Sequence, residues 1–290
     1  MKRTLRKIYG YASRLGFDPL TGAANLRGVP NFVADLQAFK HANTEPELWR
    51  IGDLSPCLKD RFEESGAASG HYFHQDLLVA RRVHARSPEV HVDLGSRIDG
   101  FVAHVASFRP IEVFDIRALT ASIPNVRFKQ CDITAPLPAE LVQSCDSLSC
   151  LHALEHFGLG RYGDPIDPDG HRVALANLAQ VVKPGGWFYL SVPIGPQRIE
   201  FNAHRVFALG HLLDLVAPMF DVRAVSYVDD RGDLHENVDL GDPQLRDSFG
   251  CRYGCGIVEM VRRDQDEPAS SSLCSRPAMA RQHLRTTGRY

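Results

Sequence analysis

Residues 91–117 read HVDLGSRIDGFVAHVASFRPIEVFDIR, and this stretch decides the expected fold class. It contains two apolar runs, one that ends at Asp93-Leu94-Gly95 and one that ends at Asp115, with a helix-like segment between them. From Gly95 to Asp115 is 115 − 95 = 20 residues, the length of one strand–helix–strand unit of a nucleotide-binding sheet. A glycine at the first turn lets a ligand approach the backbone, and a carboxylate at the tip of the next strand accepts hydrogen bonds from both ribose hydroxyls. The spacing therefore predicts a site for a ligand that carries adenosine.

Composition narrows the class of protein. The chain has 290 residues and a formal net charge of −2, so its overall field gives no reason to expect a nucleic-acid partner. No run of about 18 apolar residues is present, which argues against a membrane span. The seven cysteines form no CxxC pair, and residues 1–16 lack the apolar core of a signal peptide. These features predict a cytoplasmic protein with free thiols.

From residue 89 onward, strand-like and helix-like segments alternate. Candidate strands are residues 89–94, 111–116, 126–131, 145–151, 186–193, 220–229 and 255–263, and candidate helices are 98–108, 138–143, 171–183 and 204–217. The last two strands have no convincing helix between them. This pattern predicts an α/β fold with a Rossmann-like, mainly parallel, seven-stranded sheet whose last strand is antiparallel.

The sequence predicts three consecutive segments. Residues 1–88 read as a helical N-terminal extension, 89–263 as the Rossmann-like domain, and 264–290, with Ser-Ser-Ser and few large apolar groups, as a disordered tail. Residues 1–16 carry five basic and no acidic side chains, and their apolar residues Leu5, Ile8, Tyr9, Ala12 and Leu15 recur at helical spacing. Such a helix either packs on its own domain or makes a weak peripheral contact with an anionic membrane.

Five motifs in order resemble the class I S-adenosylmethionine-dependent methyltransferases over residues 89–230. They are VDLGS at 92–96, FDIR at 114–117, QCDI at 130–133, SLSCLHALEH at 147–156 and VVKPGGWFYLSVP at 181–193. GHYFHQD at 70–76 and EHFGLGRYGDPIDPDG at 155–170 are similar to a poorly characterised bacterial branch filed as a domain of unknown function. The chain departs from the wider family at Arg97, where a second glycine is usual, so the loop is expected to follow a different path.

The resemblance implies S-adenosylmethionine as the cofactor and assigns residues to it. The cofactor-binding residues it implies are Asp93, Gly95, Ser96, Asp115, Ile116, Arg117, Asp132 and Leu151. Asp115 is expected at the ribose and Asp132 at the adenine amine, although an acid before a turn also serves as a cap.

Methyl transfer needs alignment of the acceptor and, for a hydroxyl acceptor, a base. The candidate catalytic residues are His152, His156 and His204, because a histidine has a suitable pKa. His152-x-x-Glu155-His156 is similar to a metal-binding Glu-x-x-Glu-His of some small-RNA and quinone methyltransferases. His152 replaces the first glutamate of that pattern, so no metal is assigned.

The expected acceptor is a small polar molecule or a glycan, and a role in surface-polysaccharide assembly is a hypothesis. The polar, glycine-rich segment 157–170 is expected to be a mobile loop at the acceptor entrance. Two other readings stay open. One is a nicotinamide-dependent oxidoreductase, which Arg97 disfavours because a side chain there crowds a pyrophosphate. The other is a non-catalytic scaffold with a methyltransferase-like fold. The oligomeric state does not follow from the sequence.

Overall fold

The computed structural model describes residues 9, 12–13, 16, 18–63, 65–66 and 68–264. Contacts divide the chain into two compact units, Met1–Ala67 and Ala68–Tyr290. Most of the basic segment 1–16 and nearly all of the predicted tail lie outside the described residues. None of the described helices is long and apolar enough to cross a membrane.

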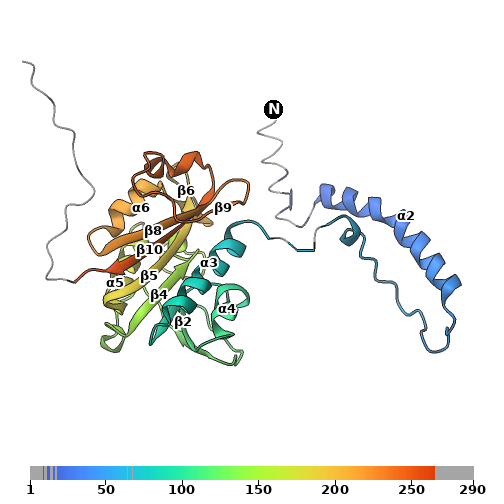
Figure 1. Cartoon of the computed structure of the whole chain (residues 1–290), viewed down its shortest axis with the longest axis horizontal. Helices are drawn as coiled ribbons and strands as arrows, with labels where there is room; N and C mark the ends of the chain where they lie inside the picture. Colours follow the sequence, from blue (N-terminus) through green and yellow to red (C-terminus); the bar gives the residue numbers. More distant parts are fainter. Residues whose placement is uncertain are drawn as a thin grey trace, which may run out of the picture. The chain divides into compact units, whose positions relative to one another are not determined.

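The second unit is built around one sheet (Figure 1). Its strands are β1 (His91–Leu94), β2 (Ile111–Asp115), β3 (Val126–Gln130), β4 (Cys145–Leu151), β5 (Val182–Ile194), β8 (Phe220–Val228), β9 (Leu234–His235) and β10 (Gly254–Arg262). They lie in the order β3-β2-β1-β4-β5-β10-β8-β9. Strands β1 to β5 pair in parallel, and β10 is antiparallel to both β5 and β8. The predicted fold class is confirmed, and the two-residue β9 adds an eighth strand to the seven expected.

The remaining elements are helices, short helical segments and one hairpin. The helices are α2 (Pro19–Ala42), α3 (His71–Arg86), α4 (Ala103–Ala106), α5 (Gly170–Val181) and α6 (Leu209–Val216), with short helical segments η1 (Asp60–Phe62), η2 (Ile98–Val102), η3 (Ala139–Leu141), η4 (Leu154–His156) and η5 (Leu245–Gly250). A separate hairpin pairs β6 (Arg198–Glu200) with β7 (His204–Val206). Helix α2 and η1 belong to the first unit.

Two helices predicted as continuous are interrupted. The segment 98–108 divides into η2 and α4 because Gly100 leaves helical geometry, at φ −123° and ψ −111°. The segment 204–217 begins as strand β7, because its first three residues pair with β6 before α6 starts.

The strand register leaves the carboxyl ends of β1, β2 and β4 at one edge of the sheet.

Each face of the sheet is covered by its own apolar cluster. One cluster includes side chains from α5 and α6, and the other includes Leu78, Val79 and Val83 of α3. Figure 1 shows these two pairs of helices, α5 with α6 and α3 with α4, on different sides of the sheet. Since α3 packs on the sheet, it belongs to the second unit, and the division between the units falls before it rather than at residue 88.

The sheet face beneath α3 is rich in buried polar side chains. Alternation along the strands places on this face His91, Asp93, Ser147, Ser149, Ser191 and Glu259, all buried. Helix α3 supplies partners for part of this set: the Ser191 hydroxyl donates to Gln75 at 2.6 Å, and Glu259 accepts from Arg82 at 2.9 Å. A buried polar group needs a partner to offset its desolvation, so α3 and this face depend on each other.

Candidate active site

Three segments meet at a tight corner formed by Gly95. Its φ is +72°, and its N–H donates to the carbonyl of Phe114, the residue before Asp115, at 2.9 Å. A Cβ atom on Gly95 would stand 2.9 Å from the Cβ of Ala153, in the segment after β4. Both the positive φ and this close approach require glycine here. The corner therefore brings the ends of β1, β2 and β4 together.

Asp93 supports the corner from below. Its carboxylate is fully buried and accepts from the Ser96 hydroxyl at 2.6 Å, the Ser96 N–H at 3.1 Å and the Ser149 hydroxyl at 2.6 Å. Burial raises the pKa of Asp93 to about 6, although these hydrogen bonds oppose the rise. Asp93 and Ser96 thus fix the path of the turn on which a ligand would lie.

His91 extends this buried network along β1. Its Nδ1 lies 2.8 Å from the Ser147 hydroxyl, and its Nε2 lies 3.2 Å from the Ser149 hydroxyl that donates to Asp93. Burial lowers the pKa of His91 to about 3. The imidazole is therefore neutral in the folded protein at neutral and mildly acidic pH.

We expect His91→Gln to reduce the loss of stability in acid. The unfolded histidine takes up a proton near pH 6.5 and the folded one only near 3, so stability falls as the pH drops between these values. Asp93, with its raised pKa of about 6, works in the opposite direction between pH 6 and 4. At pH 5 the histidine alone costs about 2 kcal/mol relative to pH 7.

Urea unfolding of both proteins at pH 7 and pH 5 measures this difference. The drop in unfolding free energy between the two pH values should be about 2 kcal/mol smaller in His91→Gln. Equal drops in the two proteins would show that His91 does not stay neutral when folded.

Asp115 stands at the tip of β2 beside the corner, as predicted. Its carboxylate accepts from the Arg117 backbone N–H at 2.8 Å and from the Arg117 guanidinium at 3.0 and 2.6 Å. The guanidinium carbon in turn lies 4.5 Å from the ring centre of Tyr162. Ile116 is half-buried and uses its carbonyl to accept from Gln130 at 2.8 Å. The acid expected at the ribose is therefore held by Arg117.

Two other predicted cofactor residues have contacts of their own. Asp132, which follows β3, accepts from the backbone N–H and hydroxyl of Thr134 at 2.9 and 2.6 Å, the turn-capping role that the sequence left open. Leu151, at the end of β4, is buried in the apolar cluster beneath α3.

Two of the three predicted catalytic histidines, His152 and His156, lie beside the buried carboxylate of Glu155, and the third, His204, pairs with Glu200 at 3.5 Å. Glu155 Oε1 lies 2.7 Å from His152 Nδ1 and 3.7 Å from His156 Nε2. The rings of His156 and His204 are 6.5 Å apart, centre to centre. Burial lowers the pKa of both His156 and His204, whereas Cys255 and Glu155 outweigh burial and raise the pKa of His152. Neutral His156 and His204 can accept a proton near pH 7.

The segment 157–170 is tied to the site by hydrogen bonds and is not the free loop expected. The buried carboxylate of Asp164 accepts from the backbone N–H groups of Gly158, Gly160 and Tyr162 at 2.8, 3.2 and 3.1 Å. On the other side, the buried guanidinium of Arg205 donates to the carbonyls of Phe157, Pro168 and Glu155 at 2.6, 3.1 and 3.4 Å. The carboxylate of Asp164 and the guanidinium of Arg205 thus hold the segment 157–170 in place.

Sequence reasoning gave no role to several residues at this edge of the sheet. Asp76 of α3 is buried close beside Gly100, and burial raises its pKa to about 6. His71 of the same helix stacks on His152, with ring centres 5.2 Å apart. The motif GHYFHQD was the available signal, but nothing in the sequence placed it beside the segment after β4.

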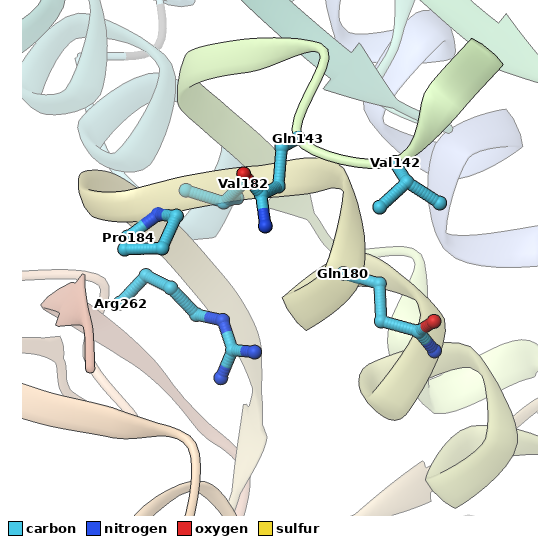
Figure 2. A pocket seen from close by; sticks show the side chains of 6 residues that line it. All are labelled: Val142, Gln143, Gln180, Val182, Pro184 and Arg262. Carbon is cyan, nitrogen blue, oxygen red and sulfur yellow. The ribbon is translucent and has the colours of Figure 1, made fainter. Parts of the chain in front are cut away.

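Figure 2 shows a pocket at the other end of the sheet. It is lined by Val142, Gln143, Gln180, Val182, Pro184 and Arg262. Gln143 precedes β4, Val182 begins β5 and Arg262 ends the antiparallel β10. Residues at the starts of parallel strands lie away from the edge where ligands of such sheets bind. This pocket is therefore separate from the candidate active site.

A family model described as "Caenorhabditis protein of unknown function, DUF268" matches residues 125–238. This is less than half of the chain, and the family has no assigned activity.

Two curated relatives are ubiquinone biosynthesis O-methyltransferases. The one from Paracidovorax citrulli is 31% identical over 83 residues, which cover 29% of this chain and 30% of the relative. The one from Albidiferax ferrireducens is 33% identical over 98 residues, which cover 34% of this chain and 33% of the relative. The chain thus spans about a third of the length of these relatives. The resemblance to methyltransferases is confirmed over that part.

Solved structures of similar shape include two methyltransferases that contain S-adenosylhomocysteine. One is the 1,6-didemethyltoxoflavin-N1-methyltransferase of Burkholderia thailandensis, with 19% identity, a TM-score of 0.44, and coverage of 66% of this chain and 79% of that chain. The other is the N-methyltransferase NodS of Bradyrhizobium japonicum WM9, with 13% identity, a TM-score of 0.44, and coverage of 79% and 98%.

Proposed function

We propose that this chain is an S-adenosylmethionine-dependent methyltransferase. One observation carries the proposal: Asp115, at the tip of β2, stands beside the glycine corner of β1 in a sheet of order β3-β2-β1-β4-β5. A carboxylate in that position can accept hydrogen bonds from both ribose hydroxyls of an adenosine, and ligands of such sheets bind above the strand ends.

In this proposal some residues position the cofactor and others accept a proton from the acceptor. S-adenosylmethionine supplies a methyl group that is already activated on a sulfonium. Asp115, Gly95 and Ser96 position it, while His156 and His204 remain neutral and can take a proton from an acceptor hydroxyl. Methyl transfer to that oxygen leaves a thioether on the donor side and the proton on a histidine, so charge and atoms balance.

Calorimetric titration with S-adenosylhomocysteine tests the proposal. We expect one saturable site, and an increase in unfolding free energy of about 2.7 kcal/mol when the ligand is present at 100 times its Kd. NADH is titrated in parallel. Binding of NADH alone would favour an oxidoreductase, and binding of neither ligand would favour a non-catalytic scaffold.

The finer proposal is that the acceptor is a small polar molecule or a glycan, as in surface-polysaccharide assembly. Arg161 is exposed at the site, donates to the Ala203 carbonyl at 3.0 Å and lies over the Tyr162 ring at 5.2 Å. An exposed guanidinium and an adjacent phenol can bind carboxylates and sugar hydroxyls.

A phenolic acceptor with an apolar tail is a second candidate, because exposed apolar side chains lie in the two segments that carry Arg161 and His204. Ile166 of the segment 157–170 is 68% exposed, and Phe201 of the β6–β7 turn is 75% exposed. The O-methyltransferase relatives are named for ubiquinone biosynthesis. Transfer of a labelled methyl group to glycans and to prenylated phenols, compared side by side, distinguishes the two acceptor classes.

A further inference from the structure

Three side chains that are distant in sequence place metal-binding atoms together. They are His71 at the start of α3, His152 after β4 and Cys255 on β10, and one donor atom from each lies within 4.8 Å of the other two. His152 is 8% exposed, and Cys255 is completely buried. Two imidazoles and a thiol at this separation match the donors that Zn²⁺ and Co²⁺ prefer.

His152 is held in the orientation of a metal ligand. Its Nδ1 lies 2.7 Å from Glu155 Oε1, so the carboxylate accepts the Nδ1 proton, and a metal ion would bind the other ring nitrogen, Nε2, in place of its proton. This Nε2 is buried and has no hydrogen-bond partner among the described residues. A carboxylate behind a histidine is the usual support of a zinc-binding imidazole.

The backbone at His152 adds an independent observation. Its φ is +53°, in the left-handed region that a residue other than glycine adopts at a cost of about 1–3 kcal/mol. Such strain persists where the surrounding structure imposes it, commonly at a ligand site. The strained residue is also one whose buried ring nitrogen has no hydrogen-bond partner in the part of the chain that the structure describes.

The thiol of Cys255 makes only weak hydrogen bonds with its neighbours. Its sulfur lies 3.8 Å from Gln75 Oε1 and 3.9 Å from the carbonyl of Gly256, which are weak contacts for a thiol. Cys251, four residues earlier, is also buried but does not belong to the cluster. The pair Cys251-x-x-x-Cys255 therefore contributes one ligand and not two.

We propose that His71, His152 and Cys255 form a binding site for a zinc-class divalent metal ion, with Glu155 as the residue that positions His152. Three protein ligands leave one coordination position open, as in catalytic zinc sites. This inference does not depend on methyl transfer. If the proposed function also holds, the open position is available to an acceptor hydroxyl, whose proton a metal ion makes easier to remove.

Cobalt titration of the full chain after dialysis against a chelator tests the site. We expect one equivalent of Co²⁺ to bind and to give thiolate-to-cobalt charge-transfer absorption in the near ultraviolet, together with the visible bands of a tetrahedral ion. Cys255→Ser should lose the charge-transfer band and bind Co²⁺ at least 100-fold more weakly. The matched control Cys251→Ser should keep both the band and the affinity.

Glu155→Gln distinguishes a positioning residue from a ligand. It should keep the charge-transfer band while Co²⁺ affinity falls by about 10–100-fold. Absence of Co²⁺ binding by the unmodified chain would overturn the proposal. So would loss of the band in Cys251→Ser, or equal behaviour of the two cysteine variants.

The same samples separate this inference from the proposed function. The protein dialysed against a chelator is titrated with S-adenosylhomocysteine. Binding is expected because Asp115 and Gly95 do not belong to the metal cluster. Cobalt binding without S-adenosylhomocysteine binding would leave the metal site standing and refute the cofactor. The reverse result would refute the metal site alone.

Discussion

Asp115→Asn is expected to weaken S-adenosylhomocysteine binding about 30-fold. Two hydroxyl bonds to an ionised carboxylate contribute about 2–3 kcal/mol, more than the same bonds to a neutral amide. Release of Arg117 from Asp115 subtracts less than about 1 kcal/mol, because the Arg117 side chain is 53% exposed and an exposed ion pair contributes little. The difference is about 2 kcal/mol, which corresponds to the 30-fold change. Isothermal titration calorimetry measures it directly.

Glu112→Gln is the matched control for this experiment. Glu112 lies on the same strand, three residues before Asp115, and pairs at 3.6 Å with Arg127. Its neutralisation changes the net charge by the same amount, yet the affinity should stay within about twofold because the residue lies away from the strand tip. Equal weakening in both variants would mean that overall charge, and not a ribose contact, determines the affinity.

Arg205→Met is expected to destabilise the second unit by about 3 kcal/mol. The substitution removes three hydrogen bonds from a buried guanidinium and leaves the carbonyls of Phe157, Pro168 and Glu155 without their charged donor, the last of them in a buried place. Each hydrogen bond to a charged group contributes about 1.5–3 kcal/mol, although water entering the space recovers part of the loss. For a unit of this size, the corresponding decrease in Tm is about 6–12 °C.

Arg198→Met provides the comparison, since Arg198 lies in the same hairpin and also donates to two carbonyls, those of Pro196 and Arg252. Its side chain is 35% exposed, so water replaces the lost donor and the cost should stay below about 1 kcal/mol. A calorimetric Tm of Arg205→Met within 2 °C of the unmodified protein would show that Arg205 does not hold the segment 157–170.

The sheet could be predicted from local sequence because its signals are local. Strands β1, β2, β4 and β5 contain apolar runs bounded by turn residues, and the helical segments between β1 and β2 and between β4 and β5 are typical of parallel pairing. Strand β3 shows instead the alternation of apolar and polar residues that is typical of a half-buried strand. The predicted helix boundaries were wrong where a contact between residues distant in sequence determines the local structure. The continuous helix over 98–108 is interrupted at Gly100, beside the buried carboxylate of Asp76, and β7 exists only because β6 lies beside it.

The candidate site also combines residues that local sequence places with residues that only long-range packing brings together. Gly95 and Asp115 could be placed from their spacing, because both lie at the ends of neighbouring strands. The grouping of His71, His152 and Cys255 could not, because these residues come from the start of a helix, a loop and the antiparallel strand. No periodicity connects them, and only the packing of α3 on the sheet brings them together.

The pairing of Arg117 with Asp115 has a consequence for the proposed function. The guanidinium of Arg117 neutralises the carboxylate that is proposed to bind the ribose. Under the proposed function, a nucleoside would exchange places with the Arg117 side chain, so the number of hydrogen bonds to Asp115 would change little on binding. Selectivity for the nucleoside would then depend on how well its two ribose hydroxyls replace a planar guanidinium.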